Sequence, residues 1–297
     1  MNLKQPLTVS EQLLKLKEHG LVVESDQEAK ELLSRVSYYR LSGYGLQFRI
    51  SASSSKYCAG TTLVQVLDSY LFDESLRSIF RIYLERIEIY ARTNIATGFS
   101  LAKCREEPCD AHYHDANFYN KSGYDFIMNS LEREERHSQD SLFVQHHKKR
   151  YENRMPLWVM AELLSFSNLS KLYSAMYTSE QISIAKMMHT KPATLRNHLH
   201  CMSTFRNKCA HGARLYNSNF SFPAKLGKKY LQKNPGIKTS SLFSYVIVML
   251  RRLPTVEYRK ALVAEIVALL SEYADRIDPI FIGFPVNYLP LLWNETR

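Results

Sequence analysis

The longest helical pattern in the chain runs from Thr61 to about Leu101 and reads TTLVQVLDSYLFDESLRSIFRIYLERIEIYARTNIATGFSL. Its apolar side chains recur every three or four residues, which is the spacing of one face of an α-helix. Charged residues interrupt this face, among them Glu88 and Arg92, whose four-residue offset favours an ion pair within the helix. A second interpretation places Arg92 beside the later segment 206–211. The pattern predicts one long helix.

Helical periodicity also dominates the rest of the sequence. Capping residues mark two early helices, with Thr8 before a leucine-rich segment and Asp26 before Gln27–Leu33. No alternating strand pattern is present, and no internal repeat has the length of a solenoid unit. The sequence therefore predicts an all-α fold. Further helices are expected over residues 125–154, 157–166, 169–177, 194–211, 241–253 and 256–277.

Composition places the chain among ordinary globular proteins. Apolar residues make up 45% of its 297 residues, and Gly and Pro number only 10 each, which argues against disorder. The net charge is +10 and the isoelectric point is near 9.3. This excess of Lys and Arg favours a polyanionic partner such as nucleic acid. A basic balance that serves only solubility is the alternative.

Cysteine usage and the lack of targeting signals bear on the compartment. The five cysteines are an odd number spread thinly over the sequence. Met1–Gly20 lacks the basic and then apolar pattern of a secretory signal. No apolar run approaches the ~20 residues that span a bilayer, and Tyr245–Leu250 is the most apolar block. We expect a cytoplasmic protein with reduced thiols and no membrane partner.

Four residues about a third of the way along the chain have side chains of the kinds that bind zinc: Cys104, Cys109, His112 and His114. Their spacing, Cys-x4-Cys-x2-His-x-His, differs from the tighter cysteine pairs of zinc fingers and ribbons. A thiol pair in a cytosolic loop is the simpler interpretation. Glycine-rich phosphate loops, dinucleotide fingerprints and a Gly-x-Ser-x-Gly elbow are also absent from the sequence. No metal or cofactor is therefore predicted.

The richest chemistry lies in the segment Arg206-Asn-Lys-Cys-Ala-His211. Arginine grips a phosphate through two parallel hydrogen bonds and keeps its charge. Histidine titrates near neutrality and can move the proton of a ribose 2′-hydroxyl. Asn207 can orient either side chain by hydrogen bonding. These three residue types suffice for cutting RNA without a metal ion. The alternative is a surface helix end whose histidine complements the helix dipole.

Helical geometry decides how these side chains are presented. At about 100° per residue, Asn207 and His211 share one helix face. Arg206 lies roughly 140° away from His211, with a side chain long enough to reach back. Gly212 follows directly and is expected to end the helix, which leaves His211 in the last turn.

Aromatic and basic residues also gather in three other places. The first set comprises Tyr38, Tyr39, Arg40, Tyr44 and Arg49. Such a set could stack on bases and hold phosphates, or it could clamp the N-terminal helices to the body. The other two places are Lys148-Lys149-Arg150 and a looser basic segment that contains Lys228 and Lys229.

The motif and its surroundings resemble those of a known family. Residues 206–217, which read RNKCAHGARLYN, resemble the signature of the Abi-like (AbiD/AbiF) abortive-infection proteins of bacteria, a branch of the HEPN superfamily. Further blocks agree with the family in the same order along the chain. They are YYRLSGY at 38–44 with Phe48-Arg49, LERIEIYAR at 84–92, residues 156–166 and residues 283–293.

The resemblance implies an all-α, HEPN-type helical bundle with an N-terminal helical extension. We expect residues 1–60 to form this N-terminal helical region. Residues 61–277 are expected to form the helical domain, and residues 278–297 a tail packed on the body.

For function, the resemblance implies a metal-independent endoribonuclease of a phage-defence or toxin–antitoxin system. Such proteins act as homodimers that bring two Arg/His motifs into one cleft. Arg206 and His211 are the expected catalytic residues, with Asn207 as their polar neighbour. A small structured non-coding RNA is an expected partner beside the RNA substrate. Gly212 departs from the family, because many members have a second histidine there. The side chains expected to bind RNA are Arg40, Arg49, Arg92, Lys148, Lys149, Arg150, Arg214, Lys228 and Lys229.

Two other functions stay open at this point. In one, Arg206 and His211 hold a target or non-coding RNA without cleaving it. In the other, the chain is a helical scaffold that assembles through Trp158 and the apolar tail from Phe284 to Trp293. A His211→Ala variant that keeps its RNA affinity but no longer arrests growth would favour the enzyme over the binding module.

Overall fold

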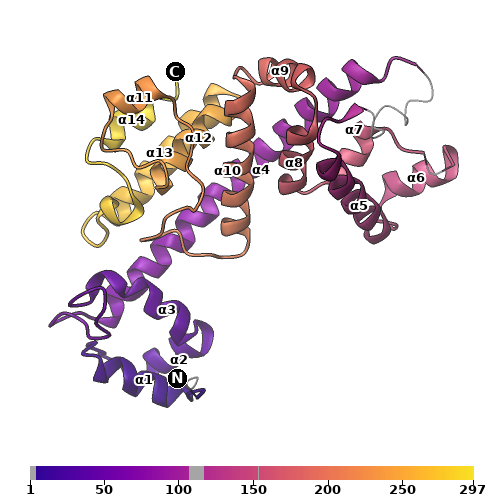
Figure 1. The fold of residues 1–297 in the computed structure, drawn as a ribbon. Coiled ribbons are helices and arrows are strands. Elements are labelled where there is room, and N and C mark those ends of the chain that lie inside the picture. The colour runs from indigo at the N-terminus through magenta and orange to yellow at the C-terminus, as the bar shows by residue number, and fades with distance from the viewer. Residues whose placement is uncertain (1–4, 107–116, 153) are drawn as a thin grey trace.

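The computed structural model describes residues 5–106, 117–152 and 154–297, and these are arranged as packed helices (Figure 1). Within those ranges no β-strand forms, and only isolated bridges occur, for example between Val22 and Thr62. Helices hold 67% of the residues, so the all-α prediction is confirmed.

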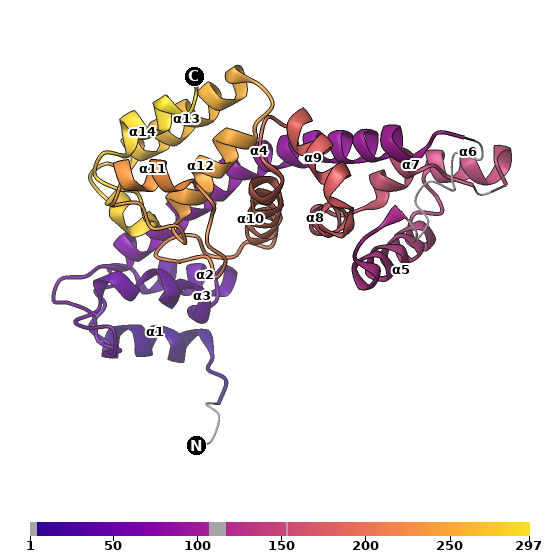
Figure 2. The ribbon, with the colours of Figure 1, turned by 45° about the horizontal axis from the view of Figure 1, so that its top comes forward.

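One helix of 41 residues, α4 (Leu63–Lys103), runs through most of the molecule (Figure 1, Figure 2). A rise of 1.5 Å per residue makes it about 60 Å long. It begins with a capping box, in which the side chains of Thr62 and Gln65 each accept a hydrogen bond from the other residue's backbone N–H. Its apolar stripe is buried from Leu63 to Phe99. The predicted long helix is confirmed to within two residues at each end.

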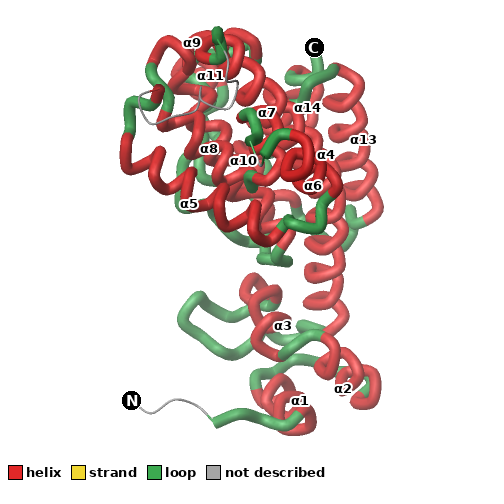
Figure 3. The backbone as a smooth tube through the Cα atoms, turned by 90° about the vertical axis from the view of Figure 1, so that its right-hand side faces the viewer, coloured by secondary structure: helices red, strands yellow, loops and turns green. Residues whose placement is uncertain are grey.

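Three helices pack at the N-terminal end of α4 and form a cluster below the main body in Figure 3. They are α1 (Val9–Glu18), α2 (Asp26–Arg35) and α3 (Tyr38–Tyr44). Thr8 caps α1, as predicted, and its side chain accepts a hydrogen bond from the N–H of Glu11. Ser25 caps α2 in place of Asp26, because the Ser25 hydroxyl accepts from the N–H of Glu28. That predicted helix start is therefore wrong by one residue.

Helix α10 (Pro192–Ala210) crosses α4 and packs directly against it (Figure 1). Pro192 occupies the first helical position, where its missing N–H has no partner to lose. Phe205 packs on Phe80 of α4 with ring centroids 4.9 Å apart. All four side chains predicted to face inward are buried, namely Leu195, Leu199, Met202 and Phe205.

Two groups of helices flank this crossing (Figure 1, Figure 2). One group consists of α5 (Lys121–His137), α6 (Leu142–Arg150), α7 (Leu157–Met160), the 3-10 helix η4 (Ala161–Leu163), α8 (Phe166–Ala175) and α9 (Thr178–Met187). The other consists of α11 (Lys228–Lys233), α12 (Leu242–Arg252), α13 (Val256–Glu272), the 3-10 helix η5 (Pro279–Ile282) and α14 (Tyr288–Asn294). A further 3-10 helix, η1 (Leu46–Phe48), follows α3.

The structure corrects two of the predicted helices. Residues 125–154 do not form one helix, because the chain turns where the N–H of Ser141 donates to the carbonyl of Ser138. Residues 157–166 are also interrupted. Leu164 is extended, and Ser165 then caps α8 by accepting from the N–H of Asn168. Helix α9 forms where no helix is predicted.

The last part of the chain folds back against α12. Phe284 is buried, and its ring lies 5.1 Å from that of Phe243. Glu295 accepts two hydrogen bonds from the guanidinium of Arg251 at 2.8 and 2.7 Å. Deleting residues 284–293, the tail that the scaffold interpretation assigns to assembly, would therefore expose the hydrophobic core of the chain itself. Among the described helices, none has both the length and the apolar character needed to cross a bilayer.

Candidate functional site

His211 stands at the C-terminal end of α10, as predicted. Gly212 has a φ of +62°, the left-handed conformation that glycine adopts without strain. The N–H of Gly212 donates to the carbonyl of Cys209 at 3.3 Å, and that of Ala213 donates to the carbonyl of Lys208 at 2.8 Å. These two bonds form a Schellman motif. The helix therefore stops at a defined place and leaves the imidazole of His211 exposed.

A carboxylate from α4 holds Arg206. Oε2 of Glu88 lies 3.3 Å from Nε of Arg206, and Oε1 of the same carboxylate lies 3.1 Å from Nη2 of Arg92. The predicted pair between Glu88 and Arg92 is thus confirmed, and the same carboxylate links Arg92 to Arg206 of α10. The Glu88 side chain is only 10% exposed while that of Arg206 is 39% exposed. The guanidinium is therefore anchored from inside and still reaches solvent.

Asn207 orients Arg206. Its Oδ1 accepts a hydrogen bond from Nη1 of Arg206 at 3.3 Å, and its Nδ2 donates to the hydroxyl of Ser167 in α8 at 3.2 Å. Two of the three guanidinium nitrogens of Arg206 are thus engaged, Nη1 by Asn207 and Nε by Glu88. In the part of the chain that the structure describes, no group accepts a hydrogen bond from Nη2 of Arg206. That nitrogen is left for a ligand.

The other polar side chains of the motif are partly or fully shielded. Burial raises the pKa of the Cys209 thiol to about 12, so this thiol is protonated and unreactive near neutral pH. Nζ of Lys208 lies 4.8 Å from the ring centroid of Phe220, and burial lowers the pKa of this amine. The exposed imidazole of His211 is the group of this motif that is best placed to move a proton.

Two arginines tie the motif to α3. Nη2 of Arg40 donates to the carbonyl of Gly212, and Nη1 of Arg214 donates to the carbonyl of Gly43. A Cβ atom at position 212 would lie 2.7 Å from Nη2 of Arg40, which is too close for any side chain unless Arg40 moves. Gly212 therefore leaves room for this guanidinium, and a side chain at position 212 would require Arg40 to move.

A buried carboxylate completes this junction. Asp73 of α4 pairs with Arg77 one turn later in the helix. It also accepts hydrogen bonds from the hydroxyl of Tyr44 at 2.7 Å and from the N–H groups of Leu215 and Tyr216 at 3.1 and 2.8 Å. Burial raises the pKa of the Asp73 carboxyl, while Arg77 and the hydrogen-bond donors oppose that effect. Asp73 thus fixes α3 and the end of the motif to one point on α4.

Three arginines of the predicted RNA-binding set line one cavity beside this junction. The cavity has a volume of about 400 Å³ and is bordered by Arg40, Arg49 and Arg214 together with Tyr39 and Tyr44. Tyr39 is 89% exposed. Nε of Arg49 is buried and has no partner among the described residues. Guanidinium groups beside an exposed aromatic ring suit an anionic ligand that carries bases.

The remaining basic residues lie elsewhere. Lys148, Lys149 and Arg150 end α6, and Lys228 and Lys229 begin α11. Figures 1 and 2 place α6 and α11 on opposite sides of α10. The structure does not bring these five side chains to the motif. Their contact with RNA stays a prediction.

Most of the possible zinc ligands fall outside the described residues. This applies to Cys109, His112 and His114, whereas Cys104 directly follows α4. In the described ranges, no group of three or more His, Cys, Asp or Glu side chains is arranged to hold a metal ion.

Three contacts of the site, made by Asp73, Glu88 and Ser167, were not predicted from the sequence. Asp73 has a recognisable signal, because it forms a charged pair with Arg77 at a four-residue offset inside the apolar stripe of α4. The contact of Glu88 with Arg206 has no signal in the sequence, since the four-residue offset to Arg92 already accounts for the charge of Glu88. The contact of Ser167 with Asn207 has no signal either, because serine is common near helix starts.

A known protein family matches the part of the chain that forms this site. The Abi-like protein family matches residues 31–217, which is more than half of the chain and includes α3, α4 and the whole motif of α10. The C-terminal block at 283–293 lies outside that match. No curated protein and no solved structure matches the chain. The chain therefore belongs to the Abi-like family, and its membership points to abortive infection, a bacterial defence against phage.

Proposed function

We propose that this protein is a metal-independent endoribonuclease that acts in abortive infection, with Arg206 and His211 as catalytic residues. One observation carries the proposal. At the end of a single helix, an exposed imidazole accompanies a guanidinium that Glu88 and Asn207 hold in place. A pre-oriented cation and an accessible proton acceptor are what phosphodiester cleavage by the 2′-hydroxyl needs.

The reaction uses the ribose of the substrate as its nucleophile. His211 takes the proton of the 2′-hydroxyl, and the 2′-oxygen attacks the adjacent phosphorus. Arg206 stabilises the charge that builds on the phosphate oxygens. The bond from phosphorus to the 5′-oxygen breaks, and this oxygen takes a proton from a second His211 or from water. The products are a 2′,3′-cyclic phosphate and a 5′-hydroxyl.

Glu88 is a positioning residue in this scheme. Its carboxylate binds Nε of Arg206, so it fixes the orientation of the guanidinium and does not touch the substrate. A Glu88→Gln variant removes the charge but keeps the shape. We expect kcat to fall about tenfold while KM changes little, because an oriented cation matters most in the transition state.

Two copies of the chain are proposed to form the complete site. One motif presents a single Arg206 and a single His211, so the second His211 that could protonate the leaving group must come from another copy of the chain. A homodimer that apposes two α10 ends supplies it. We expect specific activity to fall when the protein is diluted below its dimer dissociation constant. A monomer whose specific activity is independent of concentration would exclude the shared cleft.

A second function is supported by the cavity beside α3. Arg40, Arg49 and Arg214 line it with an exposed Tyr39, and aromatic stacking with cationic contacts is how single-stranded RNA is held. The carboxylate of Glu88 also offsets the charge of Arg206. In this alternative the protein holds a small structured non-coding RNA or a target RNA without cleaving it.

The test is RNA cleavage by the purified protein in the presence of EDTA. We expect cleavage to persist and its product to end in a 2′,3′-cyclic phosphate. A DNA strand of the same sequence should remain intact, because it lacks the nucleophile. Arg206→Ala and His211→Ala should each lower the rate by at least about 100-fold.

His200→Ala is the matched control, because His200 is another exposed histidine on α10. This variant should cleave at the wild-type rate. If EDTA abolishes cleavage, or if His200→Ala is as inactive as His211→Ala, the proposed chemistry is wrong. RNA binding that survives in His211→Ala, with no cleavage in any variant or in the wild type, would favour the second function.

A further inference from the structure

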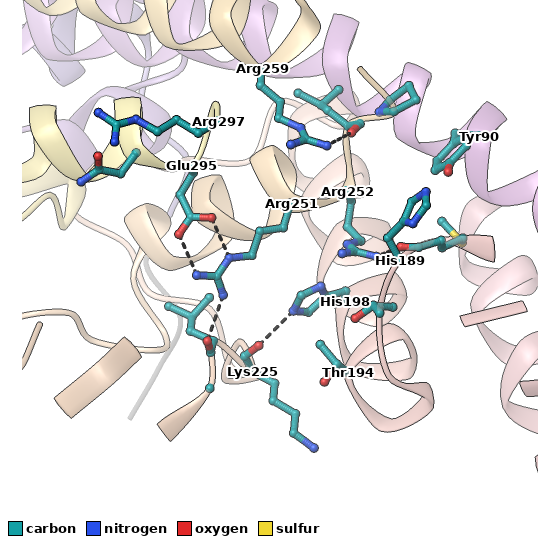
Figure 4. A pocket seen from close by; sticks show the side chains of 17 residues that line it. Tyr90, His189, Thr194, His198, Lys225, Arg251, Arg252, Arg259, Glu295 and Arg297 are labelled. Atoms are coloured by element: carbon teal, nitrogen blue, oxygen red, sulfur yellow. Dashed lines mark hydrogen bonds and ion pairs between the residues drawn. The ribbon is translucent and has the colours of Figure 1, made fainter. Parts of the chain in front are cut away.

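A second cationic cavity lies at the other end of α10, away from the motif. Its volume is about 490 Å³. Figure 4 shows that its side chains come from α4, from the N-terminal half of α10, from the end of α12 and from the C-terminal segment. Five basic side chains and one acidic side chain border it, namely Lys225, Arg251, Arg252, Arg259, Arg297 and Glu295.

The charges of this cavity are not balanced by its own residues. Glu295 is engaged by Arg251 through two hydrogen bonds, so it is not left for another cation. Lys225 points away from the other labelled side chains in Figure 4. No further acidic side chain from the described ranges lines the cavity. Arg252 and Arg259 therefore line it without an acidic partner.

Arg252 is the strongest sign of a missing partner. Its residue is only 7% exposed, and its Nε is buried without a hydrogen-bond acceptor among the described residues. Nη1 donates to the carbonyl of Met188 at 2.9 Å, which is a neutral acceptor. Burial lowers the pKa of Arg252 to about 10, and the neighbouring Arg251 and Arg259 act in the same direction. A buried cation surrounded by cations is unfavourable unless an anion joins it.

His198 contributes an unpartnered hydrogen-bond acceptor to this cavity, whereas the arginines contribute donors. It is 1% exposed, and its Nε2 lies 2.9 Å from the carbonyl of Lys225. A carbonyl only accepts, so Nε2 carries the proton and Nδ1 presents a lone pair. That Nδ1 is buried and has no partner within the described part of the chain. The cavity thus presents donors for an anion together with one acceptor for a hydroxyl or amino group.

We propose that this cavity binds a small phosphorylated molecule of nucleotide size, with its phosphate on Arg252 and Arg259 and a hydroxyl or amino group on Nδ1 of His198. The volume lies in the range of small-ligand pockets and exceeds what one phosphate fills. Tyr90 and His189 lie on the Arg252 side of the cavity in Figure 4, where their rings can stack on a base. Phosphate, hydroxyl and base together make a nucleoside phosphate the fitting class.

The test is thermal unfolding of the full chain with adenosine 5′-monophosphate, inorganic phosphate or adenosine at 1 mM. We expect adenosine 5′-monophosphate to raise the Tm by about 4 °C or more if its Kd is near 10 μM. Inorganic phosphate should raise it less, and adenosine should leave it unchanged. No shift with adenosine 5′-monophosphate up to 10 mM would overturn the proposal. An equal shift with inorganic phosphate would overturn the nucleotide assignment.

Variants locate the binding in this cavity. Arg252→Gln should abolish the shift. Because this residue is buried, Arg259→Gln serves as a second variant on a half-buried position, and isothermal titration should show at least about tenfold weaker binding. Arg133→Gln, which alters an exposed arginine of α5, is the control and should keep the full shift. A shift that persists in both cavity variants would place the ligand elsewhere.

This inference does not depend on the proposed nuclease function. The Arg206→Ala variant should keep the full shift with adenosine 5′-monophosphate, since the motif lies at the opposite end of α10. If that variant loses the shift, the ligand occupies the motif and the proposed second site is wrong.

Discussion

The two ends of α10 use the same residue types in opposite settings. At the C-terminal end His211 is exposed, and Arg206 is partly exposed and shares the carboxylate of Glu88. In the N-terminal half His198 is 1% exposed, and the nearby Arg252 has no carboxylate partner.

This difference decides what each end can do. Burial lowers the pKa of His198 to about 3, so its imidazole is neutral at physiological pH. Its Nε2–H donates to the carbonyl of Lys225, and its Nδ1 is left as a hydrogen-bond acceptor. An exposed imidazole such as that of His211 is accessible to solvent and to a bound ligand. Exposure and charge pairing, more than residue identity, therefore separate a site suited to proton transfer from one suited to binding.

The largest expected effect contrasts the two histidines. His211→Ala should lower the cleavage rate by about 10²–10⁴ and leave the Tm nearly unchanged, because the side chain is exposed. His198→Gln should lower the Tm, since it replaces a buried ring that contacts the carbonyl of Lys225, but the rate per folded molecule should stay near wild type. Rate measurements alongside circular dichroism check both. An equal loss of cleavage in His198→Gln would end the distinction.

The second effect contrasts two buried arginines. Asp73→Asn leaves Arg77 buried without its counter-charge and should lower the free energy of unfolding by about 3–5 kcal/mol. Arg252→Met removes a charge that has no acidic partner, and the free energy of unfolding should stay within about 1 kcal/mol of wild type in phosphate-free buffer. Urea unfolding measures both. Comparable losses would show that Arg252 is already compensated in the ligand-free protein.

The third effect is a pH dependence that belongs to His198. Its pKa is about 3 in the folded protein and near 6.5 when unfolded, so between these values the unfolded chain binds the extra proton. Stability should therefore fall as the pH drops below 6.5, by about 2 kcal/mol between pH 7 and pH 5. Comparing urea unfolding of wild type and His198→Gln isolates this contribution. The same slope in both proteins would assign it to other groups.

The smallest effect concerns the end of the motif helix. Gly212→Ala should cost about 1–2 kcal/mol of folding free energy, because φ is +62° and the new Cβ would lie 2.7 Å from Arg40. In an Arg40→Ala background only the backbone cost should remain. A double-mutant cycle by thermal unfolding measures the coupling. Strict additivity would mean that Arg40 does not fill this space in solution.

Sequence patterns predicted those parts of the fold that depend on neighbours along the chain. Periodicity located α4, and Gly212 located the end of α10. The break after His137 has no glycine or proline to mark it, so α5 and α6 look like one helix. Helix α9 has only a weakly amphipathic pattern and ends without a glycine.

The site was predictable only in part, for the same reason. A four-residue offset indicates that Glu88 pairs with Arg92, but the contact of Glu88 with Arg206 depends on how α10 crosses α4. The burial of Arg252 likewise depends on the carbonyl of Met188 and on segments that are distant in sequence. The spacing of residues along the chain does not predict such tertiary contacts.

The two arginines that join α3 to the motif have a mechanical consequence. Arg40 holds the carbonyl of Gly212, 172 positions later in the chain, and Arg214 holds the carbonyl of Gly43 in return. Any ligand that pushes α3 outward must rupture both links or drag the terminus of α10 with it. A ligand on the α3 surface can therefore displace His211 through these two hydrogen bonds.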